Sequence, residues 1–276
     1  MEQELRLQPF LKWAGGKRQL LSSIRAYLPK QFATYYEPFV GAGALLFDIR
    51  PEKAVINDLN SELINCYRII KENLDELLID LAKHCNDVDY YYQIRDLDRQ
   101  PQFNGMSAVE RASRIIYLNK TCYNGLFRVN SEGQYNVPFG RYKNPRIVDE
   151  GLLRSISSYL NQNDIKILNT DFAEATGEAQ AGDFIYFDPP YDPVSNTASF
   201  TGYNLSGFGR EEQVRLRDHF KTLDQKGCFV LLSNSATEFI YELYRNYKIV
   251  TVTANRAINS KADGRGKVAE VLIMNY

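Results

Sequence analysis

Residues 35–58 have the sequence YYEPFVGAGALLFDIRPEKAVIND. The aromatic and β-branched run at 35–40 predicts a short strand, which Gly41-Ala42-Gly43 and an apolar helix at 44–49 follow at once. A second short strand is expected at 53–57, and it ends directly before Asp58. A strand, a glycine turn, a helix and a further strand are the beginning of a doubly wound sheet. The sequence therefore predicts an α/β fold.

The same alternation returns after residue 164. Strands are expected at 165–168, 184–187 and 228–232, with a helix at 210–225. The final two strands are expected at 248–253 and 268–274. Because a short loop containing glycine joins these two, we expect them to form an antiparallel pair at the end of the sheet.

The middle of the chain has a different pattern. Apolar residues at helical spacing predict helices in the first part of residues 61–163, including one at 108–119, and a β-hairpin is expected at 126–137 around Asn130-Ser131-Glu132-Gly133. We therefore expect one α/β domain, formed by residues 1–60 and 164–276, with a mainly helical insert, residues 61–163, that carries the hairpin.

The composition is that of a globular protein. The 276 residues are 44% hydrophobic and 24% charged, values that exclude disordered, collagenous and disulfide-scaffold classes. Four scattered cysteines without a CxxC pair, and only two histidines, make a zinc site unexpected. The beginning MEQELRLQPF has no signal-peptide core, and no stretch approaches the roughly 20 apolar residues of a membrane span. We expect a soluble, cytoplasmic protein.

Charge is balanced overall but not locally. The 33 Lys and Arg against 34 Asp and Glu exclude a uniformly basic nucleic-acid binder. Between residues 120 and 147, however, Glu132 is the only acidic residue among five basic ones, which are Lys120, Arg128, Arg141, Lys143 and Arg146. Aromatic residues alternate with these cations, as suits phosphates and exposed bases. A hairpin with a solvated face is the alternative interpretation.

The strongest chemical signal is Asp188-Pro189-Pro190-Tyr191, directly after the apolar strand expected at 184–187. The prolines end the strand and remove two donors, leaving a carboxylate, an outward Pro189 carbonyl and an aromatic ring. If the carboxylate and this carbonyl each accept one N–H hydrogen of an adenine amino group, the nitrogen lone pair becomes available, while Tyr191 stacks on the base. The alternative is a strand-ending turn with a surface Asp.

Two further segments suggest ligand binding. Glycines after the first strand, Gly41 and Gly43, allow a cofactor to approach the backbone, and Asp58 is placed to accept hydrogen bonds from ribose hydroxyls. The segment Lys12-Trp13-Ala14-Gly15-Gly16-Lys17 superficially suggests a phosphate-binding loop. That motif needs Gly at position 11 and Ser or Thr at 18, where this chain has Leu11 and Arg18, so no phosphate cradle is predicted.

Five motifs in this order resemble those of Dam-type DNA adenine-N6 methyltransferases of the α group, including modification enzymes of restriction systems that act on GATC. They are KWAGGK at 12–17, EPFVGAG at 37–43, Asp58, YNGLFRVN and GQYNVPFGRYK between 123 and 143, and DPPY at 188–191. The resemblance extends from about Pro9 to the C-terminal region. It implies a Rossmann-like S-adenosylmethionine (SAM) dependent methyltransferase sheet, with the insert as the target-recognition region.

The resemblance also implies roles for individual residues. SAM would be the cofactor, S-adenosylhomocysteine the product, and no metal would be needed. Trp13, Lys17, Asp58 and Asp188 match cofactor-binding positions, and the loop of Phe39, Gly41 and Gly43 would lie under the methionine end of SAM. Asp171 and Phe172 match positions beside the adenine of the cofactor.

For the DNA, the resemblance implies contacts from the hairpin region. Arg128 matches a residue that recognises a guanine in the major groove, where Arg paired with O6 and N7 is the commonest specific contact. Leu126 and Pro138 match residues that touch a thymine methyl group, and Tyr123 and Asn124 match residues that enter the duplex beside the orphaned base. Arg141 and Lys143 belong to the same basic stretch.

These residues predict adenine-N6 methylation of double-stranded DNA with the target base flipped out of the helix. Cytosine-N4 methylation uses the same amino-group chemistry and stays an alternative, as do RNA or protein amide methylation and a non-catalytic DNA-binding module. Cytosine-C5 methylation is disfavoured because no cysteine follows a proline, and a nuclease because no D…ExK site is apparent. A cognate restriction endonuclease in the same system, and association with the bacterial nucleoid, are further expectations from the resemblance.

Overall fold

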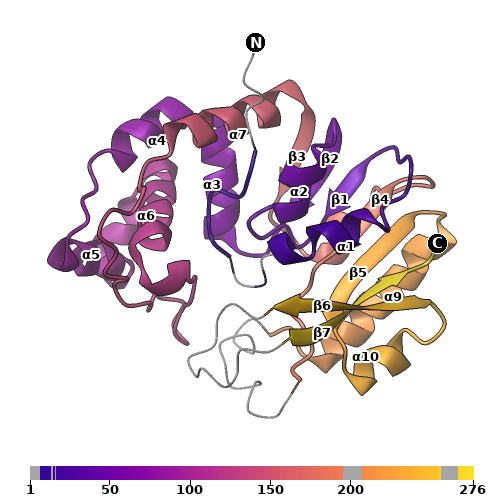
Figure 1. Cartoon of the computed structure of the whole chain (residues 1–276). Helices are drawn as coiled ribbons and strands as arrows, with labels where there is room; N and C mark the ends of the chain where they lie inside the picture. Colours follow the sequence, from indigo (N-terminus) through magenta and orange to yellow (C-terminus); the bar gives the residue numbers. More distant parts are fainter. Residues whose placement is uncertain (1–6, 14, 16, 195–206, 256–266) are drawn as a thin grey trace. The chain divides into compact units, whose positions relative to one another are not determined.

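The computed structural model describes residues 7–13, 15, 17–194, 207–255 and 267–276. Its strands form one mixed seven-stranded sheet in the order β3-β2-β1-β4-β5-β7-β6 (Figure 1). The strands are β1 (Tyr35–Glu37), β2 (Lys53–Asn57), β3 (Asp164–Leu168), β4 (Phe184–Phe187), β5 (Phe229–Ser235), β6 (Lys248–Asn255) and β7 (Lys267–Met274). The predicted α/β fold with a Rossmann-like, mostly parallel sheet is confirmed.

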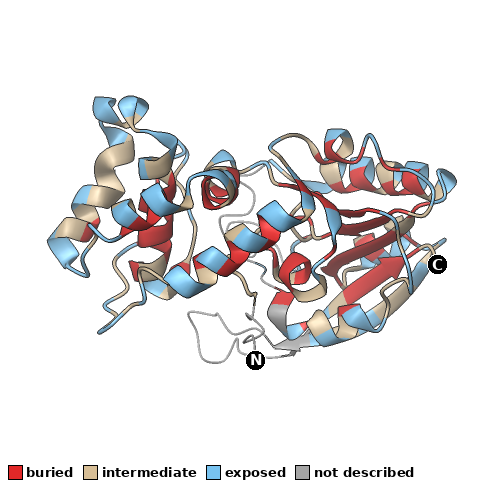
Figure 2. Cartoon of the chain, turned by 90° about the horizontal axis from the view of Figure 1, so that it is seen from above, coloured by how far each residue is buried: buried red, intermediate tan, exposed pale blue. Residues whose placement is uncertain are grey.

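The centre of the sheet is parallel. Strand β1 pairs with β2 and β4, and β4 pairs with β5, in each case in parallel. The carboxyl ends of parallel strands lie at one edge of a sheet, where ligands of such folds bind. The strand expected at 35–40 ends at Glu37, because Pro38 has no N–H to continue a ladder. These strands are buried, and Figure 2 shows them in red.

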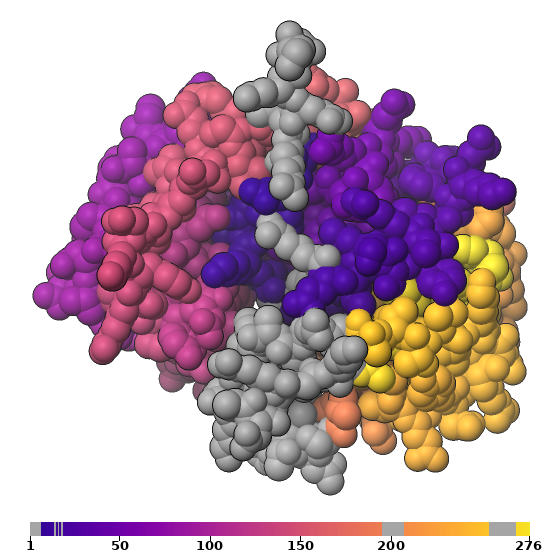
Figure 3. Space-filling model, in the orientation of Figure 1, coloured from indigo at the N-terminus to yellow at the C-terminus, as the bar shows by residue number. Residues whose placement is uncertain are grey.

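The end of the sheet is antiparallel, as predicted. Strand β7 pairs antiparallel with both β5 and β6, and Ser235 of β5 lies opposite Glu270 of β7. The loop between β6 and β7 lies outside the described residues. Figure 3 shows the described residues of this end of the chain in orange to yellow on the surface.

The chain divides into two compact units. One comprises Met1–Gly16, Gly41–Glu52 and Asp58–Asn169, and the other comprises Lys17–Val40, Lys53–Asn57 and Thr170–Tyr276. We call them the helical unit and the sheet unit, since most strands belong to the second. Among its described residues, the helices of the sheet unit are η1 (Lys17–Gln19), α1 (Leu21–Arg25), α8 (Phe172–Ala175), α9 (Arg210–Gln225) and α10 (Glu238–Leu243).

The helical unit contains both long helices and short 3-10 turns. Its described helices are α2 (Ala44–Ile49), α3 (Ser61–Glu72), α4 (Leu74–Leu81), α5 (Val88–Arg95), η2 (Asp96–Arg99), η3 (Pro101–Gly105), α6 (Ala108–Thr121), η4 (Tyr123–Gly125) and α7 (Glu150–Gln162). Helix α6 begins where it does because the side chain of Ser107 and that of Glu110 bond each other's backbone N–H in a capping box. Among the described residues, no helix is long and apolar enough to cross a membrane.

The expected hairpin is present as a turn with very little ladder. The backbone N–H of Asn130 donates to the carbonyl of Gln134, and Gly133 takes a φ of +79° in the turn. The Asn130 side chain accepts hydrogen bonds from two N–H groups of the turn. The backbone pairing of its two arms is limited to an isolated bridge between Val129 and Tyr135. Other parts of the helical unit therefore hold the hairpin in place.

Candidate functional site

The segment after β4 presents a buried carboxylate. Strand β4 ends at Phe187, so Asp188 is the first residue beyond its carboxyl end. Oδ1 of Asp188 lies 2.9 Å from the ammonium of Lys17 and accepts a hydrogen bond of 2.8 Å from the Ser233 hydroxyl. The Lys17 side chain is 7% exposed and that of Asp188 is 18% exposed, so water screens this ion pair little. Lys17 was predicted at the site, whereas Ser233 was not.

Two acceptors of this segment remain available. Within the described part of the chain, neither Oδ2 of Asp188 nor the carbonyl oxygen of Pro189 accepts a hydrogen bond. Burial raises the pKa of the Asp188 carboxyl, and Lys17 and Ser233 act in the opposite direction. The Asp188 carboxylate thus lies beside a cation through Oδ1, while Oδ2 can still accept a hydrogen bond from a ligand.

Polar side chains at the end of β5 and on α9 bind the loop that follows Asp188, at residues 190–192. The amide oxygen of Asn234 accepts from the backbone N–H of Asp192 at 3.1 Å, and Gln213 of α9 donates to the Pro190 carbonyl at 2.7 Å. The Asn234 amide also donates to Gln213, so the two amides fix each other. Thr237 donates to the buried Asp192 carboxylate. The shape of the loop is thus set by residues that no sequence motif predicts.

The ring of Tyr191 is fixed at two points. Its hydroxyl donates to Oε2 of Glu270 on β7 at 2.8 Å, and the Lys17 ammonium lies 4.4 Å from the ring centroid. Burial raises the pKa of the Tyr191 hydroxyl, which therefore acts as a neutral donor. The fold thus brings Lys17, from the first part of the chain, to Asp188 and Tyr191 of the DPPY segment.

An aromatic group follows β1 in the sheet unit. The ring of Phe39 lies 5.6 Å from that of Phe172, and the amide of Asn57 links this region by donating to the carbonyls of Pro38 and Thr170. Asp171 has both carboxylate oxygens bound to the guanidinium of Arg215, at 2.9 and 2.6 Å. This pair lowers the pKa of Asp171.

In the helical unit, the glycine loop is built around Asp58. Oδ2 of Asp58 accepts from the Gly41 N–H at 3.1 Å, and Oδ1 accepts from the Asn60 N–H at 2.9 Å. Gly41 and Gly43 have φ of +48° and +71°, a region that other residues rarely adopt. Burial raises the pKa of the Asp58 carboxyl to about 6, and the two N–H donors limit that increase.

Trp13 and Tyr67 pack against this loop. A β-carbon at Gly41 would lie 3.0 Å from the Trp13 ring, and one at Gly43 would lie 2.7 Å from the Tyr67 hydroxyl. That hydroxyl donates to the Gly41 carbonyl at 3.0 Å. Trp13, Gly41 and Asp58, each predicted at the site, therefore lie together, and Tyr67 is an additional member.

The predicted DNA-contacting residues lie at the surface of the helical unit. Tyr123 is 53% exposed, and Asn124 beside it has a φ of +57°. The Tyr123 N–H donates to the carbonyl of the exposed Pro138, at 2.8 Å, so these two residues are neighbours. Leu126 is partly buried against an aromatic cluster.

The basic residues of the hairpin region are exposed. Arg128 donates from Nε to the side-chain oxygen of Asn136 at 2.7 Å and from Nη2 to the Asn136 carbonyl at 3.1 Å. Arg141, with a φ of +52°, and Lys143 are exposed beyond the hairpin.

Comparison with known proteins finds DNA methyltransferases along nearly the whole chain. A family model described as D12 class N6 adenine-specific DNA methyltransferase matches residues 13–258. The Type II methyltransferase M1.LlaDCHI of Lactococcus lactis subsp. cremoris is 52% identical, covering 99% of this chain and 97% of the relative. M.MjaIII of Methanocaldococcus jannaschii is 42% identical, covering 99% and 100%. A DNA adenine methylase of Escherichia coli strain K12 is 36% identical, covering 96% and 94%.

Proposed function

Because this chain belongs to the D12 class N6 adenine-specific DNA methyltransferases, and so methylates adenine N6 in DNA with SAM as methyl donor, we propose that Asp188, Pro189 and Tyr191 hold the target adenine. Oδ2 of Asp188 and the Pro189 carbonyl each accept one hydrogen of its amino group. These two bonds draw the nitrogen toward tetrahedral geometry, which frees its lone pair for attack. The observation that carries the proposal is that both acceptors have no donor among the described residues.

The fixed ring of Tyr191 provides the stacking surface. Stacking of a base on an aromatic side chain stabilises binding by about 1–3 kcal/mol. Since the Tyr191 hydroxyl is bound to Glu270, little ring motion has to be suppressed when the base arrives. Catalysis then rests on positioning and on polarisation of the amino group, and no covalent bond forms between the enzyme and the base.

The cofactor-binding residues proposed are Trp13, Lys17, Phe39, Gly41, Gly43, Asp58, Asp171, Phe172 and Asp188. When bound, SAM supplies an electrophilic methyl group on a sulfonium, and S-adenosylhomocysteine is the product. The donor set fits this group: the Asp58 oxygens each accept one backbone N–H and keep a lone pair for a ribose hydroxyl. The Phe39 and Phe172 rings offer aromatic surface for an adenine.

For the DNA, we propose that residues 61–163 form the target-recognition insert of an α/β domain made of residues 1–60 and 164–276. The exposed Tyr123 and Asn124 enter the duplex when the adenine flips out, a step that costs a few kcal/mol. Arg128 recognises a guanine, Leu126 and Pro138 contact a thymine methyl group, and Arg141 and Lys143 contact phosphates. The proposed target is GATC in double-stranded DNA, as the resemblance implies.

Relatives named Type II methyltransferases support a place in a restriction–modification system with a cognate endonuclease. We propose this setting, in the cytoplasm at the nucleoid; it does not imply direct contact between the two enzymes.

The test of the proposal is Asp188→Ala. Loss of the carboxylate abolishes methyl transfer while affinity for a GATC duplex stays within a few-fold of the parent protein. Asp218→Ala, a change at a carboxylate that is 64% exposed, is the matched control and keeps activity. Turnover by the Asp188 variant would exclude this role of the carboxylate.

A further inference from the structure

The hairpin that carries Arg128 is attached to the helical unit through its backbone. Tyr135 is 2% exposed, and its N–H donates to Oδ2 of Asp98 at 2.7 Å. Its carbonyl accepts from Nη2 of Arg99 at 2.8 Å. One residue of the hairpin thus has both backbone groups bound by two consecutive side chains of η2, in the way that a neighbouring strand would bind them.

The two binding side chains are themselves fixed. Nη1 of Arg99 lies 2.7 Å from Oδ1 of Asp98, and Arg114 of α6 lies 2.8 Å from Oδ2 of the same carboxylate. Asp98 is 9% exposed and Arg114 is 3% exposed, and Arg114 is held in turn by the Ile94 carbonyl. A buried charge pair with this many partners has one favoured geometry, so it transmits a defined position to Tyr135.

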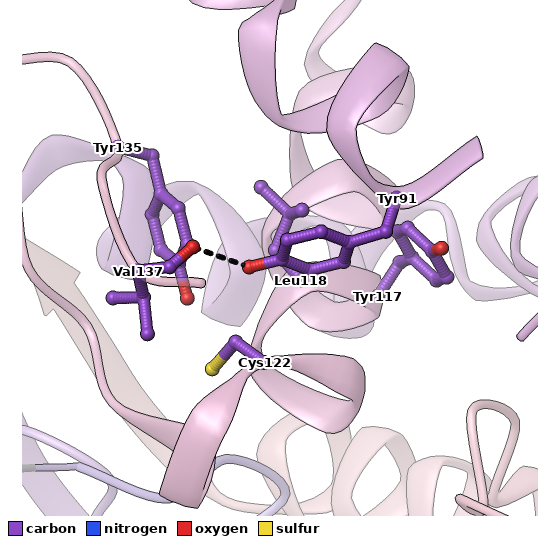
Figure 4. Packing of buried hydrophobic residues seen from close by; sticks show 6 residues of the cluster. All are labelled: Tyr91, Tyr117, Leu118, Cys122, Tyr135 and Val137. Atoms are coloured by element: carbon purple, nitrogen blue, oxygen red, sulfur yellow. Dashed lines mark hydrogen bonds between the residues drawn. The ribbon is translucent and has the colours of Figure 1, made fainter. Parts of the chain in front are cut away.

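A second attachment lies just beyond. Figure 4 shows the hydroxyl of Tyr91, from α5, pointing at the carbonyl of Val137, which it donates to at 2.8 Å. The Tyr135 ring lies in the same cluster, and its hydroxyl donates to the carbonyl of Leu126 in the opposite arm of the hairpin. Residues 135–137 are therefore the anchored arm, and the arm of Leu126 and Arg128 is positioned from it.

The guanidinium of Arg128 is connected to this anchored arm. Two of its nitrogens bond to Asn136, the residue after Tyr135, and Nη1 has no partner within the described chain. A shift of Tyr135 therefore moves Asn136 and, with it, the plane of the guanidinium. Recognition of guanine by Arg depends on that plane, since both nitrogen donors have to meet O6 and N7.

We propose that Asp98 and Arg99 are positioning residues for base recognition, which set the orientation of Arg128 through Tyr135 and Asn136 without a contact to the base. The proposal rests on the proposed role of Arg128 in recognising a guanine. It predicts that sequence discrimination depends on the forked geometry of Arg99 as well as on its charge.

The test compares methylation of two duplexes, one with GATC and one in which the guanine before the target adenine is replaced by adenine. The readout is the ratio of kcat/KM between them. Arg99→Lys keeps the positive charge but loses the fork, and we expect the ratio to fall by about fivefold or more, the lower limit for a good bidentate contact. Asp98→Asn, which keeps an acceptor for the Tyr135 N–H but loses the ion pairs, lowers the ratio in the same direction.

The matched control is Arg154→Lys in the same unit, because the exposed Arg154 guanidinium also pairs with two carboxylates, those of Asp75 and Glu150, and neither of them is bound to Asp98 or Arg99 among the described contacts. This variant keeps the ratio. Melting temperature and SAM affinity, measured for every variant, separate repositioning from unfolding. In an Arg128→Ala background, Arg99→Lys causes no further loss of discrimination, since the two residues act through one contact.

The contrary outcomes are distinct. If Arg128→Ala lowers the ratio but neither Arg99→Lys nor Asp98→Asn does, the positioning role is wrong and the role of Arg128 stands. If Arg99→Lys weakens both duplexes equally, Arg99 is only a phosphate contact. If Arg128→Ala itself leaves the ratio unchanged, the proposed role of Arg128 is wrong and this inference is excluded with it.

Discussion

The ammonium of Lys17 lies 2.9 Å from Oδ1 of Asp188, and both side chains are largely shielded from water. Burial raises the pKa of Asp188, and Lys17 is the strongest opposing influence. Lys17 therefore favours the ionised form of the carboxylate, which is the form that accepts an amino hydrogen. It does so at a point where the nearby Tyr191 ring is also in contact with the ammonium.

Lys17→Met moves the pH dependence of methyl transfer. Removal of the cation raises the pKa of Asp188 further, so the acid form persists to higher pH and kcat begins to fall at a higher pH than in the parent enzyme. The measurement is kcat against pH at saturating SAM and DNA. Lys30→Met, at an exposed lysine, leaves the profile unchanged. An unshifted acidic limb in the Lys17 variant would show that the pair does not control ionisation.

Glu270→Ala releases the hydroxyl of Tyr191. The ring then loses one of its two fixed points, and we expect kcat to fall several-fold, because a reacting base held less well reacts more slowly. Glu270→Gln keeps an acceptor and retains most of the rate. Single-turnover kinetics, measured by rapid quench, separate a slower methyl-transfer step from slower release of DNA. Equal losses in the Ala and Gln variants would point to a need for the charge of Glu270 instead.

Gly43→Ala tests the glycine loop. The positive φ alone costs about 1–2 kcal/mol for a residue with a β-carbon, and here the new carbon would also meet the Tyr67 hydroxyl. Gly182→Ala is the matched control, since Gly182 has a φ of +87° and open space around it. Denaturant unfolding should show a larger loss at Gly43. The double variant Gly43→Ala/Tyr67→Phe should lose less free energy of unfolding than the sum of the losses in the two single variants. Additive losses would argue against a clash between the new β-carbon and the Tyr67 hydroxyl.

Much of the fold follows from local pattern. The bounds of α2, β2, β4 and α9 agree with the predicted ranges, because each segment has strong apolar periodicity and clear breaking residues around it. Strand β5 runs on to Ser235, beyond the expected residue 232, since Ser and Asn have low strand propensity and gave no signal there. Yet Ser233 and Asn234 are the residues that support Asp188 and the loop after it.

The contacts that the sequence did not reveal are long-range. Glu270 is 79 positions from Tyr191, and it meets that ring because β7 returns antiparallel beside β5. Arg215 is 44 positions from Asp171. A motif identifies which residues carry the chemistry, but their partners depend on strand order and register, which a single sequence specifies only through the completed fold.

SAM affinity should depend on the ionisation of Asp58. Its pKa of about 6 is above the usual value, so the ionised form that accepts ribose hydroxyls is lost as pH falls through 6. For the same reason, ionisation opposes folding, and this group lowers the free energy of unfolding as pH rises from about 4 to 6.

The measurement is the Kd of SAM by calorimetry between pH 5 and 8. The affinity of the parent protein should weaken toward acidic pH, whereas Asp58→Asn should bind weakly at every pH with little slope. A parent profile that is flat across pH 6 would contradict the proposed contact.

We propose that GATC is the target within which this chain methylates adenine N6, and labelled SAM tests this proposal directly. The enzyme is incubated with a GATC duplex and with a duplex whose target adenine is replaced, and the nucleosides are then separated. We predict N6-methyladenine from the first duplex and no label in the second. Label on cytosine, or equal label in both duplexes, would contradict the account.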